Sequence, residues 1–364
     1  LITTHLNIGG IGSYVTSLAG ALQQRGHEIF VASSGGRLKN LLLRNRVKHV
    51  YLDIKTKSEF SPKIIRSFFA LKSFLKQEKI DVIHAHTRVT QALSALLSSF
   101  TGISYVTTCH GFFKRRVGRR IFGCWGARTI AISEAVQNHL TGDFGVDEKK
   151  IDLIHTGIEP NRFLREAPQS EKQRLKLEWG LDNGPVIGAI GRLSSVKGQD
   201  VLIRAAELII HDFPALKVLL VGDGPDESRL KKLSSGMGMD NRVIFAGSID
   251  DTAKIFPVID IFVQPSLKEG LGLSLLEAMA SRKPCIASRT GGIGSLIEDG
   301  VTGVLVKPGS HRELARAIKN IIADKNLTAV FGKNGREKVL SGFTIDEMVL
   351  KVEKAYEEAI THDA

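Results

Sequence analysis

The stretch Ser266–Ala280, SLKEGLGLSLLEAMA, follows the apolar run Ile261–Gln264 and organises the C-terminal half of the chain. An apolar run that ends in a glycine-rich turn and continues with helical periodicity predicts a strand, a loop and a helix. Glu269 lies in the predicted loop, and Glu277 lies about one turn inside the predicted helix. A helix N-terminus preceded by glycines offers backbone N–H groups and a positive dipole end to a phosphate. Because the two carboxylates beside it can accept hydrogen bonds from sugar hydroxyls, the stretch predicts a sugar-nucleotide site.

Short apolar runs alternate with helical patterns on both sides of this stretch, which predicts βαβ units and parallel sheets. Further strands are expected at Leu1–His5, Glu28–Ser33, Val82–His86, Tyr105–Cys109, Thr129–Ser133, Ile151–His155, Val186–Ile190, Lys217–Val221, Val243–Ala246, Cys285–Ala287 and Gly303–Val306. The alternation stops between Pro160 and Asn183, where the sequence is polar, and restarts at Pro185. We therefore expect an α/β fold of two doubly wound domains with a ligand between them.

Composition limits the class of protein. The chain has 364 residues, 43% of them hydrophobic, and no apolar run approaches the ~20 residues that span a bilayer. Three cysteines, an odd number without metal-ligand spacing, indicate a reducing compartment. The sequence opens inside a predicted strand with no Met and no signal-peptide pattern, so we expect that a few residues precede it.

The positive charge of the chain is concentrated in its N-terminal half. Residues 1–165 hold 24 Lys and Arg against 11 Asp and Glu, whereas residues 166–364 hold 26 against 27. The net charge of +12 therefore comes from the first half. This asymmetry predicts an anionic partner there.

Two glycine-containing turns are candidates for phosphate binding. GRLSSVKG, residues 191–198, places Arg192 and Lys197 in a loop after a predicted strand, where two cations would suit a diphosphate that gains charge as it leaves. The alternative is a pair of solvated charges, but the glycines on both sides favour a loop that wraps a ligand. The turn Gly9–Gly12 either lets a diphosphate or an acceptor approach the backbone or is a plain tight turn.

Histidines follow two of the predicted strands. His110 comes directly after one of them and could bind a sugar hydroxyl or stabilise charge on the reacting carbon; the alternative is a histidine satisfied by the backbone. His84 and His86 alternate in DVIHAH, so their side chains should point to opposite faces, with His86 the better candidate for the ligand site. No third ligand lies nearby, so we expect no metal site.

Residues 112–122, FFKRRVGRRIF, mix five basic residues with three aromatic ones, a composition that suits an anionic membrane surface. The amphipathic helix predicted for residues 61–79 could share that face. The alternatives are a solvated basic loop and a helix that faces the core. Nucleic acid is a third possibility, but no nucleic-acid motif supports it.

Several motifs together resemble those of family 4 retaining glycosyltransferases of the GT-B type (glycosyl transferases group 1). They are EGLGLSLLEAMA, GRLSSVKG, VGDGP at 221–225 and TGGIGSLIEDGVTGVLV at 290–306, with GGIGSYVTSLAGALQQRGHEIFV, DVIHAH and Cys109-His110-Gly111 in the N-terminal half. The resemblance covers nearly the whole chain and keeps the motif order. It implies two Rossmann-like domains, 1–165 for the acceptor and 166–340 for the nucleotide-sugar, facing each other across a cleft. A last helix within 341–364 would cross back to the N-terminal domain.

The resemblance also implies roles for single residues. Arg192 and Lys197 would bind the diphosphate, Glu277 would take the ribose hydroxyls and Glu269 a hydroxyl of the donor sugar. His110 would lie beside that sugar, and with Glu269, Arg192 and Lys197 it would form the catalytic group. Further nucleotide-sugar contacts would come from Gly10, Gly222, Gly270, Leu271, Gly272 and Leu273. The chain departs from the family pattern at Thr156-Gly157 and at Gly294-Ser295, so only backbone contacts carry over to residues 291–295.

By the same resemblance, the chain would be a cytoplasmic enzyme that needs neither metal nor cofactor and retains the anomeric configuration. It would move a hexosyl group from a nucleotide-sugar, most simply a UDP-sugar, to a lipid-linked or polysaccharide acceptor. Such a step belongs to cell-envelope glycan synthesis, as in lipopolysaccharide or exopolysaccharide, at the inner face of the cytoplasmic membrane. The alternatives are a GT-B sugar-nucleotide epimerase and a non-catalytic protein that binds sugar nucleotides.

Overall fold

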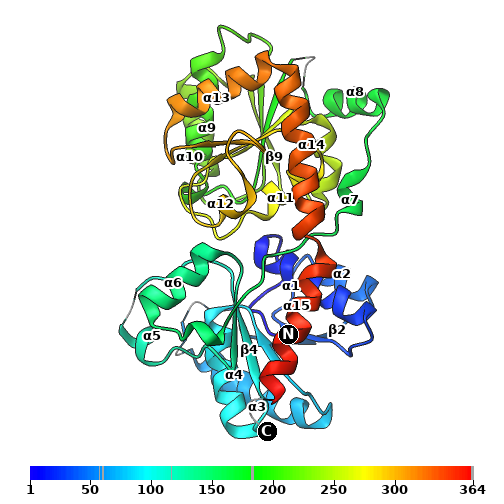
Figure 1. The fold of residues 1–364 in the computed structure, drawn as a ribbon, viewed down its shortest axis with the longest axis vertical. Coiled ribbons are helices and arrows are strands. Elements are labelled where there is room, and N and C mark those ends of the chain that lie inside the picture. The colour runs from blue at the N-terminus through cyan, green and yellow to red at the C-terminus, as the bar shows by residue number, and fades with distance from the viewer. Residues whose placement is uncertain (57, 60, 116, 182–183, 362–364) are drawn as a thin grey trace. The chain divides into compact units, whose positions relative to one another are not determined.

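The computed structural model (Figure 1) describes residues 1–56, 58–59, 61–115, 117–181 and 184–361. It divides into unit 1, formed by Leu1–Gly157 with Ile345–Ala364, and unit 2, formed by Ile158–Thr344. The first boundary precedes the expected 165/166 because helix α7 (Asn161–Leu164) packs within unit 2, where the ring of Phe163 lies 6.0 Å from that of Phe256. Among the described residues, no helix combines the length and the apolarity needed to cross a membrane.

Unit 2 contains one parallel sheet of six strands. In the order in which they lie across the sheet, the strands are β12 (Val304–Val306), β11 (Cys285–Ser288), β10 (Ile261–Gln264), β7 (Val186–Ile190), β8 (Lys217–Val221) and β9 (Val243–Gly247). The chain proceeds outward from β7 through β8 to β9 and then returns to the other side of β7. The sheet therefore reverses its strand order between β7 and β10. In open parallel sheets, ligands bind outside the strand C-termini at such a reversal.

Helices cover both faces of the unit 2 sheet, as Figure 1 shows. One group packs around α9, and the other contains α11 and α14, which contact each other. The bounds of the helices are α8 (Gln169–Glu178), α9 (Gln199–Ile209), α10 (Glu227–Gly236), α11 (Leu273–Ala280), α12 (Ile293–Leu296), α13 (His311–Ala323) and α14 (Lys325–Gly342), with 3-10 turns at Ser195–Lys197, Thr252–Lys254 and Phe256–Val258. The expected strands of this half are all present. The four inner strands β7, β8, β10 and β11 are apolar runs that are largely buried between two helical layers, and the edge strands β9 and β12 are partly buried.

Unit 1 is built from parallel strands in two groups. The strands are β1 (Phe30–Ser33), paired with β2 (Lys48–Tyr51), and β3 (Ile83–Ala85), β4 (Tyr105–Cys109), β5 (Arg128–Ala131) and β6 (Ile151–Leu153), paired in that order. The strand expected at Leu1–His5 is wrong as stated: only Ile2 makes parallel bridges, to Ala32 in β1 and Ala85 in β3. This single residue joins the two groups into one layer.

The helices of unit 1 are α1 (Gly10–Gln24), α2 (Lys39–Arg44), α3 (Pro62–Gln77), α4 (Arg88–Thr101), α5 (Val117–Ile121), α6 (Glu134–Phe144) and α15 (Ile345–Thr361), with a 3-10 turn at Glu148–Lys150. Helix α15 packs on α1, β4 and β5, so the last element of the chain belongs to the N-terminal unit. Its buried side chains Met348, Val349 and Val352 join the same core cluster as Leu18 and Leu22 of α1.

Candidate functional site

Two loops of unit 2 leave the sheet at its reversal point: residues 191–198 after β7 and residues 265–272 after β10. Their backbones are joined because the amide of Leu267 donates to the carbonyl of Val196 over 2.8 Å. Gly198 has a φ of 68°, and a Cβ there would overlap the carbonyl oxygen of Pro265. Only glycine allows this approach. The sequence pattern therefore brings Lys197 next to the loop that carries Glu269.

Glu269 accepts three hydrogen bonds on its Oε2 atom. The donors are Lys197 Nζ at 2.6 Å, Gln264 Nε2 at 2.9 Å and Ser266 Oγ at 3.0 Å. The Gln264 amide is itself held, since its Oε1 accepts from Ser274 Oγ at 3.1 Å. The Glu269 side chain is 11% exposed and the Lys197 side chain is 26% exposed, so the ion pair is mostly buried but still reaches solvent. Glu269 is thus held directly by the end of β10, by its own loop and by the loop after β7, and indirectly by α11 through Gln264.

Glu277 lies inside α11 in a different environment. Its Oε2 accepts a hydrogen bond of 2.9 Å from Thr252 Oγ1. Burial raises the pKa of Glu277 to about 7, although the Thr252 hydrogen bond and the nearby Arg162 guanidinium act in the opposite direction. Arg162 forms an ion pair with Asp251 at 2.9 Å, and the charge of Asp251 adds to the rise in pKa. Glu277 therefore changes its charge near neutral pH.

The backbone at the start of α11 is set by glycine. Gly272 precedes the helix with a φ of 112°, which only glycine adopts readily. Leu271 is 2% exposed, so its side chain belongs to the core of unit 2. Gly270 directly precedes Leu271, and Leu273 is the first residue of α11. The predicted phosphate or sugar contacts of this segment remain predictions about its amides.

Arg192 and Gly222 lie in neighbouring loops of unit 2. The Arg192 side chain is exposed, and its carbonyl accepts from Gln199 Nε2 at 3.0 Å. Gly222 has a φ of 131°, and a Cβ there would overlap the Gly191 carbonyl, so this glycine lets the β8 loop pass close beneath the β7 loop. The structure gives Gly222 a role in shaping the loop that carries Arg192; its contact with a nucleotide-sugar stays a prediction.

In unit 1, His110 lies among aromatic side chains at the end of β4. Its ring is 4.7 Å from that of Tyr14, and its Nε2 is 3.3 Å from Nδ1 of His86. Burial lowers the pKa of His110 to about 3, so the imidazole is neutral at physiological pH. At the start of α1, a Cβ on Gly9 or Gly10 would meet no atom within 4 Å. The turn therefore has open space for a ligand at Gly9 and Gly10 but not at Gly12, where a Cβ would overlap the Asn7 carbonyl oxygen.

The expectation that His84 and His86 point to opposite faces is wrong. Their ring centroids are 4.1 Å apart, because residues two positions apart along a strand point to the same face. His84 is a structural residue: its two ring nitrogens hydrogen-bond with Tyr356 Oη of α15 and Thr108 Oγ1, both at 2.7 Å. His86 is the one that contacts His110.

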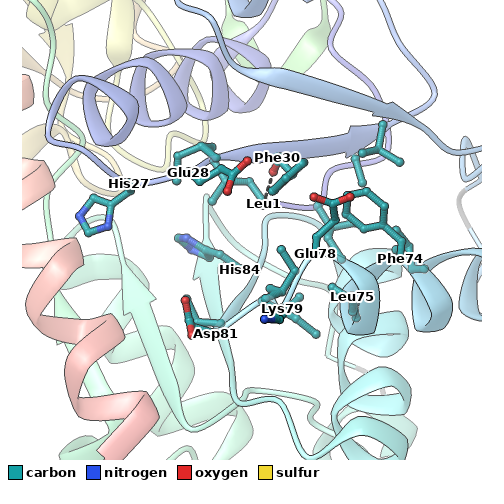
Figure 2. A pocket seen from close by; sticks show the side chains of 18 of the residues that line it. Leu1, His27, Glu28, Phe30, Phe74, Leu75, Glu78, Lys79, Asp81 and His84 are labelled. Atoms are coloured by element: carbon teal, nitrogen blue, oxygen red, sulfur yellow. Dashed lines mark hydrogen bonds between the residues drawn. The ribbon is translucent and has the colours of Figure 1, made fainter.

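A cavity of about 200 Å³ in unit 1 has His84 and Tyr356 among its lining residues (Figure 2). It is lined by Leu1, Phe30, Phe74 and Leu75, with Glu78 and Lys79 at the C-terminal end of α3. None of the residues that the sequence predicts for the active site lines it. The lining also holds three carboxylates, Glu28, Glu78 and Asp81, against one lysine, so the cavity does not suit a phosphate.

Some contacts of the site were not predicted from the sequence. Gln264 and Ser266 lie five and three positions before Glu269. Their polarity at the end of an apolar strand was a signal that the sequence offered. The sequence offered no signal for Thr252, because its hydrogen bond to Glu277 joins two segments that are 25 residues apart and connected by irregular structure. Tyr14 and Tyr356 reach the histidines from helices, which no local pattern indicates.

Two family models match consecutive parts of the chain. The description "Glycosyltransferase Family 4" applies to residues 8–162, and "Glycosyl transferases group 1" applies to residues 171–338. The chain belongs to glycosyltransferase family 4. The first match includes Gly10 and His110 of this glycosyltransferase, and the second includes Arg192, Lys197 and both candidate glutamates.

Individual relatives of the glycosyltransferase agree with this assignment. The N-acetyl-alpha-D-glucosaminyl L-malate synthase of Bacillus anthracis is 28% identical over 100% of this chain and 97% of its own length. The UDP-Gal:alpha-D-GlcNAc-diphosphoundecaprenol alpha-1,3-galactosyltransferase of Escherichia coli is 29% identical over 86% of each chain. Among solved structures, Anabaena HepE in complex with UDP-glucose matches with a TM-score of 0.87 at 24% identity, over 98% of both chains. That likeness shows the fold, so the glycosyltransferase has the GT-B architecture of two parallel-sheet α/β domains.

Proposed function

We propose that the glycosyltransferase moves a hexosyl group from a UDP-sugar to a lipid-linked or polysaccharide acceptor in cell-envelope glycan synthesis. The observation that carries the proposal is the Lys197–Glu269 pair at the sheet reversal, with Glu277 on the adjoining helix. The E. coli relative is named for a UDP-galactose donor and a diphosphoundecaprenol-linked acceptor, which supports a donor and an acceptor of these classes.

The charges of unit 2 suit a departing diphosphate. An ammonium has three N–H donors, so Lys197 can hold Glu269 and still donate to phosphate oxygens. As the bond between the sugar C1 and the phosphate oxygen breaks, negative charge grows on the diphosphate, and Lys197 with Arg192 would stabilise it. Glu269 would accept a hydrogen bond from a sugar hydroxyl, and Glu277 would accept hydrogen bonds from the ribose. Lys197 and Arg192 would thus stabilise the charge of the leaving diphosphate without a metal ion or cofactor.

The proposed reaction retains the anomeric configuration. The acceptor oxygen forms its bond to C1 on the face from which the diphosphate leaves, and the acceptor proton passes to the departing phosphate oxygen. UDP and the glycosylated acceptor are the products. His110 would serve as a neutral hydrogen-bonding partner of the donor sugar, since its low pKa leaves it uncharged.

Transfer assays separate this proposal from its alternatives. The full chain, in EDTA, is incubated with UDP-glucose, UDP-galactose or UDP-N-acetylglucosamine, with a polyprenyl-diphosphate-linked sugar, a polysaccharide or no acceptor. We expect a glycosylated acceptor whose new linkage has the anomeric configuration of the donor. Conversion of one UDP-sugar into another without acceptor would establish the epimerase instead, and UDP binding without turnover would establish a non-catalytic binding protein.

The donor that the enzyme uses should also stabilise it against heat. A ligand that binds only the folded state adds about 2.7 kcal/mol at a concentration of 100 Kd, so its addition should raise Tm by several degrees. We expect UDP and one UDP-hexose to produce this shift and uridine to produce less, because uridine lacks the diphosphate. Equal shifts with uridine and UDP would show that the cations of unit 2 do not hold the diphosphate.

UDP binding is expected to weaken as the pH falls through 7. Only the carboxylate form of Glu277 accepts hydrogen bonds from both ribose hydroxyls, and its pKa of about 7 lies above the usual range. At pH 6 the competent fraction is about one tenth, so the apparent Kd should be about ten-fold higher than above pH 8. Titration calorimetry of the wild type and Glu277→Gln measures this. The diphosphate also titrates near pH 6, and this contributes to the pH dependence of the apparent Kd in both proteins. If the apparent Kd changes with pH equally in the wild type and in Glu277→Gln, the assignment to Glu277 is refuted.

The positive excess of the N-terminal half supports peripheral attachment to an anionic membrane surface, which is where a lipid-linked acceptor would be found. We place the enzyme, as part of this proposal, at the inner face of the cytoplasmic membrane. No nucleic-acid partner is proposed.

A further inference from the structure

Unit 1 exposes a group of large apolar side chains on two adjacent helices. Ile65 and Phe69 lie one turn apart on α3 and are 59% and 67% exposed, and Phe100 at the end of α4 is 61% exposed. The buried ring of Phe68 lies 5.2 Å from both Phe69 and Phe100, so the exposed side chains meet around it. The two helices contact each other along their length, side by side at the end of unit 1 in Figure 1. Exposed apolar groups that gather in this way mark an interaction surface.

Positive charge surrounds these apolar side chains. Lys72 Nζ lies 5.2 Å from the centre of the Phe100 ring and 5.8 Å from that of Phe68. Arg66 and Lys76 are exposed on the same helix, and α3 contains no acidic residue; Glu78 follows it. Phenylalanine at the level of the lipid headgroups with lysine and arginine around it is the composition of an interfacial helix.

The basic and aromatic segment 112–122 is less suited to the same task. The ring of Phe112 packs on His139, and that of Phe113 packs on Trp125 and Phe144. In the same segment, Arg115 and Arg119 form ion pairs with Asp143 and Glu59, and Arg116 lies outside the described residues. Two of its three aromatic rings and two of its cations are therefore engaged within unit 1, which is not what the sequence pattern suggested.

We propose that Ile65, Phe69, Lys72 and Phe100, the α3–α4 patch, form the surface through which unit 1 docks on an anionic lipid bilayer. The proposal names the surface for the membrane attachment proposed above and rests on it. Charge complementarity selects the occupant: an anionic headgroup layer accepts the cations of α3 while Phe69 and Phe100 enter the interface. A symmetric pairing of two copies through the same patch would bring like charges together, which disfavours a dimer.

Vesicle sedimentation of the full chain tests the patch. The vesicles contain equal parts of phosphatidylglycerol and phosphatidylcholine, or phosphatidylcholine alone. We expect the wild type to sediment with the anionic vesicles and to be released by salt. The double variant Phe69→Ser, Phe100→Ser should bind at least about ten-fold more weakly, since two exposed rings leave the interface. Phe122→Ser is the matched control, because Phe122 is 71% exposed but lies outside the patch; it should bind as the wild type does.

Sedimentation of the double variant at the wild-type level would overturn the proposal, as would an equal loss in Phe122→Ser. A wild-type dimer in analytical ultracentrifugation that the double variant abolishes, with vesicle binding unchanged, would assign the patch to a second copy instead. Circular dichroism and UDP titration check that each variant is folded. Sugar transfer to a water-soluble acceptor without vesicle binding would refute the patch alone, and vesicle binding without any transfer would refute the proposed function alone.

Discussion

Lys197→Ala is expected to lower kcat for sugar transfer by roughly a hundred- to a thousand-fold, the range seen when one charge-stabilising group is removed from an active site. Negative charge on the diphosphate increases as its bond to the sugar breaks, so Lys197 contributes more in the transition state than in the bound substrate. The loss should therefore appear more in kcat than in KM. Initial rates of UDP release at varied UDP-sugar concentration measure both constants.

Removing Lys197 also removes one of the three donors to Glu269 Oε2, so part of the loss would come from a less restrained glutamate. Gln264 and Ser266 still hold that oxygen, and thermal melting should show that the fold is retained. Lys333→Ala is the matched control: this lysine of α14 is 64% exposed and pairs only distantly, at 3.9 Å, with Glu337. Equal kcat values for the two variants would remove Lys197 from the catalytic group.

Glu277→Ala is expected to weaken UDP binding by at least about a hundred-fold. A hydrogen bond to a charged group contributes about 1.5–3 kcal/mol, and the proposed carboxylate accepts two from the ribose. Glu277→Gln should lose less, because its amide oxygen still accepts. Titration calorimetry above pH 8, where Glu277 is ionised in the wild type, gives the three values of Kd.

Loss of affinity in Glu277→Ala should not reflect unfolding. The pKa of Glu277 is raised in the folded chain, so folding disfavours its ionised form, and replacing it with a neutral side chain removes that cost above pH 7. Thermal melting at pH 8 should thus show no loss of stability in Glu277→Gln. Glu337→Ala, on the exposed side of α14, is the control for affinity. Wild-type affinity in Glu277→Ala would show that the ribose is held elsewhere.

The strands of unit 2 were predictable because each is an apolar run that a short turn separates from a helix. The loops after β7 and β10, which carry Lys197 and Glu269, lie near each other because these neighbouring parallel strands end at the same edge of the sheet. Strand β2 was missed, since Lys48 and Tyr51 are exposed and only four residues pair with β1. An edge strand of this length has no clear apolar period.

Contacts between distant segments could not be predicted. Thr252 reaches Glu277 from a 3-10 turn, and Tyr356 of α15 reaches His84 across 272 residues. Such contacts depend on how helices, strands and loops pack against one another, and the local periodicity of the sequence does not predict them. The raised pKa of Glu277 has the same origin, because it comes from burial within the packed unit and not from a neighbour in sequence.

We propose that unit 2 holds the nucleotide diphosphate through Lys197 and the ribose through Glu277, without a metal ion. The most direct test of this proposal is titration of the full chain with UDP in EDTA, alongside Lys197→Ala, Glu277→Ala and the control Lys333→Ala. We expect one UDP bound per chain, with equal affinity in the wild type and the control and far weaker affinity in Lys197→Ala and Glu277→Ala. No binding of UDP to the wild type, or the same affinity in all four proteins, would contradict it.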